Sequence, residues 1–421
     1  MSLTDSTRKL YFDDAFRLSF EAATVTEGSF RGQPSVVLKE TCFYPESGGQ
    51  LGDVGTLRLR GGSESVDVVD TQIDDDGVIH HLVADAAHAL GVLRAGPIEG
   101  AVEPRRRARQ RLQHSSQHLL SSAFDRAGAG AATASARLGA VASTIDLAVP
   151  ALIDAEVHRA EDLVNAVIRE DLAVRAFFPS PEELAALPLR RAPKVSTDVR
   201  VVVMGEAGAP FDVTPCGGTH VSRTGQIGCV RVTGVERYKG MMRVTFLAGE
   251  EALSDARWRA RMVTELGREL SCAPAEIPQV LEKLRGELKA ERDASARLRR
   301  ELAALDARGV VASAPPAEAH ERFTFVEFRG GDLAFLRALV EALTEEPAAL
   351  AVVVGTDLVD GHHPILVQRG AARTFDCGAF MKRASARLGL RGGGAKARAE
   401  GRLPAGILRE TLVKELTLPE A

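Results

Sequence analysis

Two pairs of side chains with metal-ligand chemistry stand about one hundred residues apart in this chain. His114 and His118 belong to the segment HSSQH, and Cys216 and His220 belong to CGGTH. Thiolate and imidazole are the groups that tetrahedral zinc prefers. The two glycines of CGGTH allow that loop to curl, so that both of its candidate ligands can reach one ion. The four residues therefore predict one zinc ion per chain.

The same residues allow other interpretations. A cysteine beside a histidine can act as nucleophile and base, although such a pair needs only one of the three histidines. Two histidines can also be exposed residues of a surface helix. On a helical wheel His114 and His118 lie about 40° apart, away from the apolar stripe of Leu112, Leu119 and Ala123. That placement argues against two histidines that are merely packed in a core.

A glycine-rich segment, TCFYPESGGQLGDVG at residues 41–55, is the second dense motif. Thr41 offers a hydroxyl and Gln50 offers a donor and an acceptor. Gly48 and Gly49 permit positive φ and close approach of the backbone to a ligand. The segment lacks the Lys-Ser/Thr of a P-loop, and no helix pattern follows it, so we do not expect a nucleotide site. A plain hairpin is the alternative to a binding turn.

Basic side chains gather in two segments although the net charge is −4. In RRRARQR, Arg107 and Arg111 fall on the helix face of the histidines, where guanidiniums suit a phosphate-bearing substrate. These arginines could instead simply cover the neighbouring β domain. Residues 369–402 hold nine Lys/Arg against Asp376 and Glu400. Local fields of this kind can attract a polyanion to a protein of acidic net charge.

The elements that must position these residues change along the chain. Residues 10–102 contain short alternating runs separated by Gly, Asp and Ser, which predict a small β-barrel or sandwich, and we adopt the barrel. Residues 104–126 predict a helix that begins at Pro104 and ends near Gly128. Strands and helices mix between 130 and 250, which indicates an α+β unit.

The second half has a different composition. Residues 251–308 are rich in Ala, Arg, Glu and Leu, and their heptad leucines are interrupted at Glu291 and Ser295. This pattern fits a dimeric coiled coil or a helical hairpin that bends near SCAPAEIP. The segment ASAPPAEAHE at 312–321 predicts a linker, and a small α/β domain follows. The predicted fold is α+β multidomain, with the parts 1–102 N-terminal β-barrel, 103–250 zinc-binding α+β domain, 251–311 helical linker or coiled coil, and 312–421 C-terminal α/β domain.

The sequence also indicates in which cellular compartment we expect the protein. No apolar run approaches the roughly 20 residues that cross a bilayer. The N-terminus has no basic start followed by an apolar stretch, which argues against a signal peptide. Five scattered cysteines do not form a disulfide framework. We expect a reduced cytoplasmic protein that does not bind membranes.

The motifs TCFYPESGGQLGD, HSSQHLL, STIDL, CGGTHV and RGGGAKARAEG occur in the order found in the editing half of alanyl-tRNA synthetases. The chain resembles the free-standing AlaX trans-editing proteins of the long type. The resemblance implies hydrolysis of tRNA(Ala) mischarged with serine or glycine, with Ala-tRNA(Ala) spared and no aminoacylation. It also implies that the His/Cys group holds zinc, and that Thr41 and the turn of Gly48, Gly49 and Gln50 contact the substrate. It assigns no general base.

The resemblance to the editing half implies that 103–250 is the editing domain. The last segment resembles the DHH-associated domain of the synthetase, which implies that 312–421 is the tRNA-binding domain. One departure is that Ala136 and Arg137 stand where relatives usually have a polar or imidazole side chain. A zinc-stabilised tRNA-binding protein without catalysis is the alternative. A DHH-type phosphodiesterase is opposed by the missing acidic motifs. A homodimer could form through 251–308 or the C-terminal domain. The expected tRNA contacts are Arg107, Arg111, Arg391, Gly392, Gly393, Gly394, Lys396 and Arg398.

Overall fold

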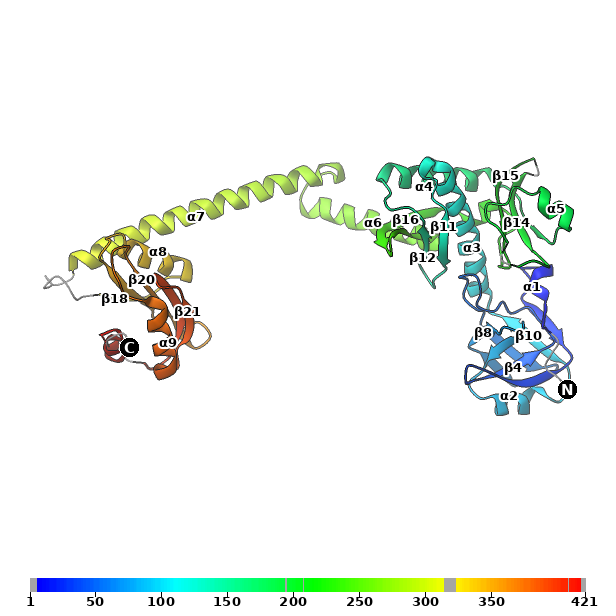
Figure 1. Ribbon diagram of the computed structural model, residues 1–421, viewed down its shortest axis with the longest axis horizontal. Coiled ribbons are helices and arrows are strands. Elements are labelled where there is room, and N and C mark those ends of the chain that lie inside the picture. The colour runs from blue at the N-terminus through cyan, green and yellow to red at the C-terminus, as the bar shows by residue number, and fades with distance from the viewer. Residues whose placement is uncertain (1–5, 194, 207, 314–322, 408, 418–421) are drawn as a thin grey trace. The chain divides into compact units, whose positions relative to one another are not determined.

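A computed structural model describes residues 6–193, 195–206, 208–313, 323–407 and 409–417 (Figure 1). The chain forms two compact units, Met1–Thr264 and Glu265–Ala421. Each unit is a mixture of helices and sheets, as the α+β prediction requires. None of the described helices is both long and apolar enough to cross a membrane.

The first unit begins with two separate four-stranded antiparallel sheets rather than a barrel. Among the described residues no strand of one sheet pairs with a strand of the other, so the predicted barrel does not close. The first sheet has the order β2 (Ser19–Ala22), β10 (Ile98–Val102), β6 (Gly55–Leu59), β7 (Ser65–Val68), and the second has the order β3 (Val25–Phe30), β4 (Gln33–Leu38), β9 (Ile79–Leu82), β8 (Asp70–Ile73).

Three short elements complete this region. The parallel pair β1 (Arg8–Lys9) and β5 (Glu40–Thr41) flanks the short helix α1 (Leu10–Asp13). Helix α2 (Ala86–Leu93) interrupts the stretch that we predicted to be entirely β. It begins where the Asp85 carboxylate accepts hydrogen bonds from two backbone N–H groups, an N-cap that a search for alternating patterns overlooks.

Helix α3 (Pro104–Phe124) is the element on which the rest of this unit is built. Pro104 occupies its first turn as predicted, and Glu103 caps the free N–H groups there. The α-helix ends at Phe124, close to the predicted end. A π-helical turn over Asp125–Ala129 follows directly, and Gly130 in the left-handed region (φ 53°) ends that turn. The apolar face of α3 packs against α4 (Asp154–Glu170) in the largest apolar cluster of the unit.

Two further sheets flank α3. One has the order β11 (Thr133–Arg137), β12 (Ser143–Leu147), β17 (Met241–Ala248), β16 (Val230–Tyr238). The other has the order β13 (Val174–Phe177), β14 (Val201–Glu206), β15 (Ala209–Pro215), with α5 (Pro181–Ala186) beside it in sequence. The strands expected in STIDL, VRVVVMG, CVRVTGVERY and MMRVTFLAG all form. A 3-10 turn, Thr224–Ile227, lies between β15 and β16, and helix α6 (Glu250–Glu269) follows β17.

The second unit is a three-layer α/β fold behind a long helix. A 3-10 turn (Pro274–Glu276) precedes α7 (Ile277–Ser313), so α6 and α7 are separate helices at the predicted bend. Six α7 leucines (Leu281, Leu284, Leu288, Leu298, Leu302 and Leu305) are 41–61% exposed. Residues 314–321 of the predicted linker lie outside the described part of the chain. The sheet has the order β18 (Thr324–Phe328), β19 (Leu350–Gly355), β20 (His362–Arg369), β22 (Arg398–Pro404), β21 (Arg391–Gly394).

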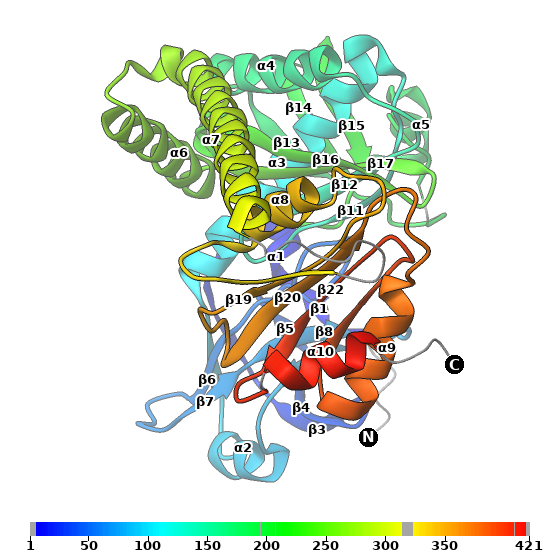
Figure 2. The ribbon, with the colours of Figure 1, turned by 90° about the vertical axis from the view of Figure 1, so that its left-hand side faces the viewer.

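Helices cover both faces of the sheet of the second unit, as Figure 2 shows around β19, β20 and β22. Helix α8 (Leu333–Leu343) and the end of α7 pack on one face through Leu336, Leu339 and Ala303. Helices α9 (Cys377–Leu388) and α10 (Arg409–Thr417) cover the other face through Phe380 and Leu412. The basic glycine-rich segment is therefore an edge strand, β21, rather than a free loop.

Candidate metal centre

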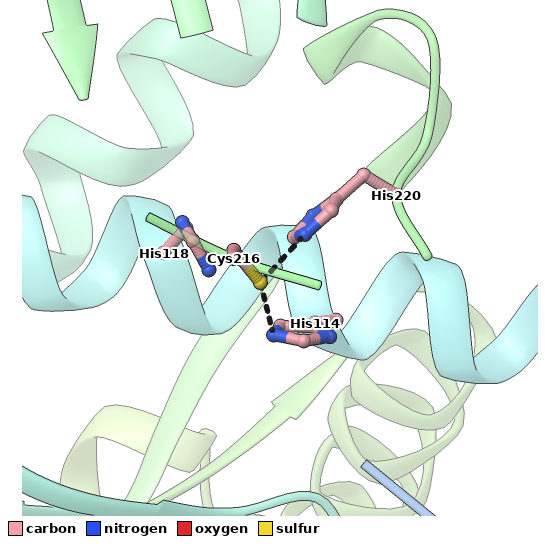
Figure 3. A group of neighbouring side chains, drawn as sticks. All are labelled: His114, His118, Cys216 and His220. Carbon is pink, nitrogen blue, oxygen red and sulfur yellow. Dashed lines mark hydrogen bonds between the residues drawn. The ribbon is translucent and has the colours of Figure 1, made fainter. Parts of the chain in front are cut away.

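The four residues predicted to hold zinc come together in the first unit (Figure 3). One ligand atom from each of them lies within 4.8 Å of those of the other three. His114 and His118 stand one turn apart on α3, so both rings point the same way. Cys216 and His220 follow the end of β15. The group could hold a metal ion, as its spacing predicted.

Glycine is required where the loop passes the helix. A Cβ on Gly218 would lie 2.1 Å from Cε1 of His114, so no other residue fits without displacing that ring. The Gly218 N–H donates to Sγ of Cys216 at 3.3 Å, and Arg200 Nη1 donates to the carbonyls of Cys216 and Gly218. The curl expected of CGGTH is thus held by named hydrogen bonds.

The hydrogen bond at Nδ1 of His114 fixes which ring nitrogen is free. Nδ1 lies 2.8 Å from Oε1 of Gln50. The backbone N–H of Thr219 also donates to that Oε1 at 3.1 Å, so the atom must be the amide oxygen. Nδ1 of His114 therefore carries the hydrogen, and Nε2 keeps its lone pair for a metal.

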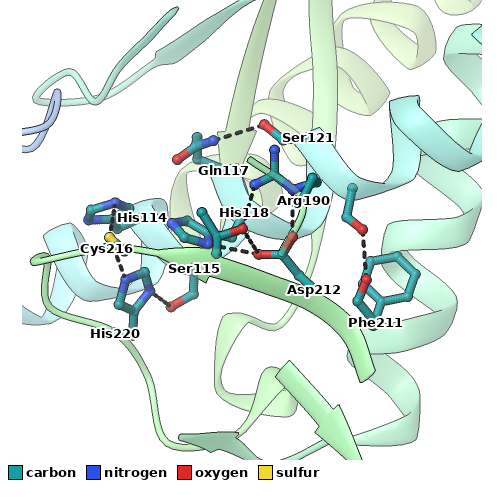
Figure 4. Close-up of polar contacts among 12 residues, drawn as sticks. His114, Ser115, Gln117, His118, Ser121, Arg190, Phe211, Asp212, Cys216 and His220 are labelled. Atoms are coloured by element: carbon teal, nitrogen blue, oxygen red, sulfur yellow. Dashed lines mark hydrogen bonds and ion pairs between the residues drawn. The ribbon is translucent and has the colours of Figure 1, made fainter. Parts of the chain in front are cut away.

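The other two histidines are oriented in the same way. Nδ1 of His118 lies 2.9 Å from the Asp212 carboxylate, which can only accept (Figure 4). Nδ1 of His220 lies 3.1 Å from Oγ of Ser115, whose own hydrogen goes to the carbonyl of Arg111 at 2.9 Å. Each Nε2 is left unprotonated and faces the group. Such partners raise the basicity of a ligating imidazole and hold its ring in place.

The Asp212 carboxylate is part of a buried network. Nε of Arg190 donates to Oδ1 of Asp212 at 2.6 Å, and the hydroxyl of Thr214 donates to Oδ2 at 2.9 Å. Although burial opposes the charge, the bonds from His118 and Arg190 lower the pKa of Asp212 to about 2. Asp212 is thus a carboxylate that supports a ligand. The sequence analysis overlooked it, together with Ser115 and Arg190, although Asp212 stands only four residues before Cys216.

Electrostatics favour the deprotonated forms of Cys216 and His220, but not of His118. Burial disfavours a thiolate, but the three neighbouring imidazoles hold the pKa of the Cys216 thiol well below its usual range. Burial disfavours imidazolium and lowers the pKa of His220 to about 3. For His118, the charges of Cys216 and Asp212 outweigh burial and raise the pKa. A thiolate beside imidazoles is the donor state that a divalent metal needs.

Distances within the group fit zinc. Sγ of Cys216 lies 3.4 Å from Nε2 of His114 and 3.4 Å from Nε2 of His220. Zinc bonds of about 2.3 Å to sulfur and about 2.05 Å to nitrogen at the tetrahedral angle place S and N about 3.6 Å apart. The donor set and these two separations are compatible with a metal ion of tetrahedral preference such as zinc, with all four donor atoms within 4.8 Å of one another.

A cavity of about 980 Å³ opens beside this group. His114 and Cys216 line it, and so do Gly48 and Gly49 of the glycine turn. Its charged lining is mostly cationic, with Lys9, Arg190, Arg191 and Arg200 against Asp198. The aromatic part of the wall is Tyr11, Phe12, Tyr44 and Phe178.

The glycine turn packs against the edge of β11. Gly48 and Gly49 have φ of 60° and 89°, and a Cβ on Gly49 would lie 2.3 Å from the carbonyl oxygen of Ala136. The N–H of Leu138 donates to the carbonyl of Gly49 at 2.7 Å. Gln50 is fully buried and holds His114 rather than lining the cavity. These contacts explain why the turn needs two glycines and then an amide.

Thr41 lies outside the described cavity lining. It is fully buried, and its Oγ1 lies 2.8 Å from Nε2 of His81. Nδ1 of His81 faces the carbonyl of Val36 at 3.1 Å, so Nδ1 carries the hydrogen and Nε2 accepts from Thr41. The N–H of Phe43 donates to Thr41 Oγ1 at 3.0 Å. The hydroxyl expected to meet substrate is already bonded inside the protein.

Of the two α3 arginines predicted to contact tRNA, Arg107 is not accessible to a phosphate. Arg107 is fully buried, and its guanidinium pairs with the buried carboxylate of Asp53 and donates to the carbonyls of Ala15 and Cys42. A phosphate cannot reach it, so the predicted tRNA contact at Arg107 is wrong. Arg111 lies over the ring of Phe16 at 3.7 Å and donates to the carbonyl of Ala15.

The remaining predicted tRNA contacts lie in the second unit. Arg391, Gly392, Gly393, Gly394 and Lys396 are exposed, on or just after β21. Arg398 is half-buried and pairs with Glu400 at 2.5 Å. A Cβ on Gly392 would lie 2.4 Å from the carbonyl of Glu400, so this glycine allows the close approach of β21 and β22. Arg398 thus lies on β22, and the other residues lie on or beside the edge strand β21.

Two family descriptions match parts of this chain. Residues 199–245 match the family described as "Threonyl and Alanyl tRNA synthetase second additional domain", and residues 11–95 match "tRNA synthetases class II (A)". The first match contains Cys216 and His220, and the second contains the segment from Thr41 to Gln50.

Three similar curated proteins are all named alanine–tRNA ligase. The protein of Halorubrum lacusprofundi is 32% identical over 359 residues, which cover 83% of this chain and 37% of the relative. That of Archaeoglobus fulgidus is 29% identical over 423 residues (97% and 43%). That of Granulibacter bethesdensis is 33% identical over 386 residues (86% and 42%). The chain thus spans less than half the length of each of these relatives.

Proposed function

Because this chain belongs to the family of proteins related to alanyl-tRNA synthetase, we propose that it is a zinc-dependent aminoacyl-tRNA deacylase. Its substrate is tRNA(Ala) mischarged with serine or glycine, and it acts in trans on tRNA charged by another enzyme. The observation that carries the proposal is the group of His114, His118, Cys216 and His220 beside the cavity.

The cavity suits the 3′ end of a tRNA. Lys9 and Arg200 lie 5.5 Å and 5.0 Å from the ring centre of Phe12, and Phe178 packs edge-on against the same ring at 5.7 Å. Aromatic faces stack on bases, and cations bind phosphate. Since Phe178 is 49% exposed, its ring is available to a base. This wall would hold the terminal nucleotide with its ester directed toward Cys216.

A zinc ion in the group would supply positive charge next to the ester carbonyl or to an attacking water. The protein residues keep that centre in place. Asp212 and Ser115 hold the Nδ1 hydrogens of His118 and His220, while Arg200 fixes the Cys216 loop. Aminoacyl esters are labile, so positioning rather than a strong general base is the main task of these residues.

Release of radiolabelled serine from Ser-tRNA(Ala) tests the proposal, with Ala-tRNA(Ala) as the second substrate. Wild-type protein should release serine well above the uncatalysed rate and spare alanine. Cys216→Ala should lose at least about 100-fold in rate together with its zinc. Cys229→Ala is the matched control, because Cys229 is half-buried in the same unit but is not in the metal group.

One observation favours a second function. Four protein ligands fill the coordination of tetrahedral zinc, which is the pattern of structural sites. A tRNA-binding protein that uses zinc only for folding would have the same group. Folded, zinc-loaded protein that binds tRNA(Ala) and releases no serine would support this second function and refute the deacylase.

We also propose that the exposed edge of β21 binds tRNA. Arg391 and Lys396 are exposed cations on or beside this strand. The described leucine row of α7 would allow a homodimer, as predicted. Sedimentation velocity of the full chain tests whether the homodimer forms. The salt dependence of tRNA binding tests whether β21 contacts the tRNA.

A further inference from the structure

Gln117 stands at the cavity wall between the metal ligands of α3. It follows His114 by three residues and precedes His118 directly, and it is 8% exposed. It lines the cavity together with Thr133 and Ser135 of the neighbouring strand β11. A bound metal ion would account for the positions of the histidines. The buried amide of Gln117 is not part of that metal group.

A hydrogen bond to Ser121 directs the amide nitrogen of Gln117 along the helix. Nε2 of Gln117 donates to Oγ of Ser121 at 2.8 Å, one helical turn away, and Thr133 Oγ1 lies 2.8 Å from the same oxygen. Figure 4 shows the amide oxygen turned away from Ser121. No described residue bonds to that oxygen. It is a preformed acceptor at the cavity wall.

Two hydroxyls of β11 in the cavity lining already donate their hydrogens within the protein. Ser135 donates to the Asp146 carboxylate at 2.5 Å, and Thr133 is bonded to Ser121. Thr41, the residue that the family resemblance pairs with a substrate hydroxyl, donates to His81. Each of these hydroxyls keeps lone pairs, but the Gln117 Oε1 is the amide acceptor of this wall to which no described residue donates.

We propose that Oε1 of Gln117 accepts a hydrogen bond from the side-chain hydroxyl of the aminoacyl group, and so makes Gln117 a specificity-determining residue. The assignment rests on the proposed deacylase function. Serine supplies the donor. Alanine fills the same space without one and leaves a desolvated carbonyl unpaired, which costs about 10- to 100-fold in rate.

The test compares Ser-tRNA(Ala) with Gly-tRNA(Ala), because glycine keeps the amino group and lacks only the hydroxymethyl group. Gln117→Leu should lower kcat/KM for the serine substrate by about 10- to 100-fold and change the glycine substrate by less than about two-fold. Gln117→Glu keeps an oxygen acceptor and should restore most of the serine activity. Zinc content and thermal midpoint should match those of wild type.

Gln113→Leu is the matched control, because Gln113 is buried on the same helix and donates to the carbonyl of Val141. It should leave the serine-to-glycine ratio unchanged. An equal loss on both substrates in Gln117→Leu, or no loss on either, would overturn the assignment. If wild-type protein releases neither amino acid, the proposed function itself fails, and the role of Gln117 fails with it.

Discussion

Gln50 and His114, 64 residues apart in the chain, meet at 2.8 Å through the amide oxygen and Nδ1. The contact joins the glycine-rich segment to the metal group. The same amide binds the N–H and the hydroxyl of Thr219, next to His220. One buried side chain thus orients ligands from two elements.

Gln50→Leu should therefore weaken zinc binding without removing a ligand. The expected loss of affinity is about 10- to 100-fold, because the Nδ1 hydrogen of His114 loses its acceptor. Competition with a chromophoric chelator measures the affinity. Gln226→Leu, an exposed glutamine that bonds only locally to Ser222, is the control and should bind zinc as wild type does. Equal affinities for the two variants would contradict the orienting role.

His81 gives the first unit a pH dependence of its own. Burial lowers its pKa to about 4 from 6.5. Above pH 6.5 the ring is neutral in both the folded and the unfolded chain. Between pH 6.5 and 4 only the unfolded chain takes up the proton, so the free energy of unfolding falls as the pH falls, by up to about 3 kcal/mol.

Urea unfolding of wild type and His81→Gln at pH 7.5, 6 and 5 measures this effect. The difference between the two proteins should shift in favour of the variant as the pH decreases, since glutamine takes up no proton. Taking the difference cancels the titration of the metal ligands, which both proteins share. His158→Gln, at an exposed position of α4, should follow the wild-type pH profile.

Arg107 is expected to govern stability rather than tRNA affinity. Arg107→Met leaves the Asp53 carboxylate buried without its cation, which costs about 3–5 kcal/mol. Arg105→Met, at an exposed position in the same helical turn, should change stability by less than about 0.5 kcal/mol. Chemical unfolding measures both. A stable Arg107→Met protein with weakened tRNA binding would reverse this conclusion.

The β21 edge is expected to bind phosphates. Arg391→Ala and Lys396→Ala should each reduce the slope of log affinity for tRNA against log salt by about one. Lys414→Ala, an exposed cation on α10, should leave the slope unchanged. Filter binding between 50 and 200 mM salt, a range over which such contacts differ measurably, reads out the slope. Unchanged slopes for all three variants would place the tRNA elsewhere.

Local geometry made the metal group predictable. The spacing of His114 and His118 places both rings on one helix face wherever that helix lies, and the glycines of CGGTH signal a tight loop. Pro104 marked the helix start for the same reason, because the residue at that position needs no N–H partner. Such features depend on neighbours along the chain and can therefore be predicted from the sequence.

Features that depend on distant partners were not predictable. Whether two sheets close into a barrel is decided by pairing between edge strands, and alternation within each strand carries no information about it. Arg107 shares the helix face of the histidines, yet only the fold shows that Asp53 lies opposite. Asp212 gains its role from its contact with His118 in the same way.

The distance along the chain between the two ligand pairs has a thermodynamic consequence. Cys216 and His114 are 102 residues apart, so an ion bound by both closes a loop of that length and removes much of the conformational freedom of the unfolded chain. Binding energy then adds to folding energy as RT ln(1 + [M]/Kd). The melting temperature of this unit would report the free zinc concentration around it, and depletion of zinc would act as a denaturant that leaves every covalent bond intact.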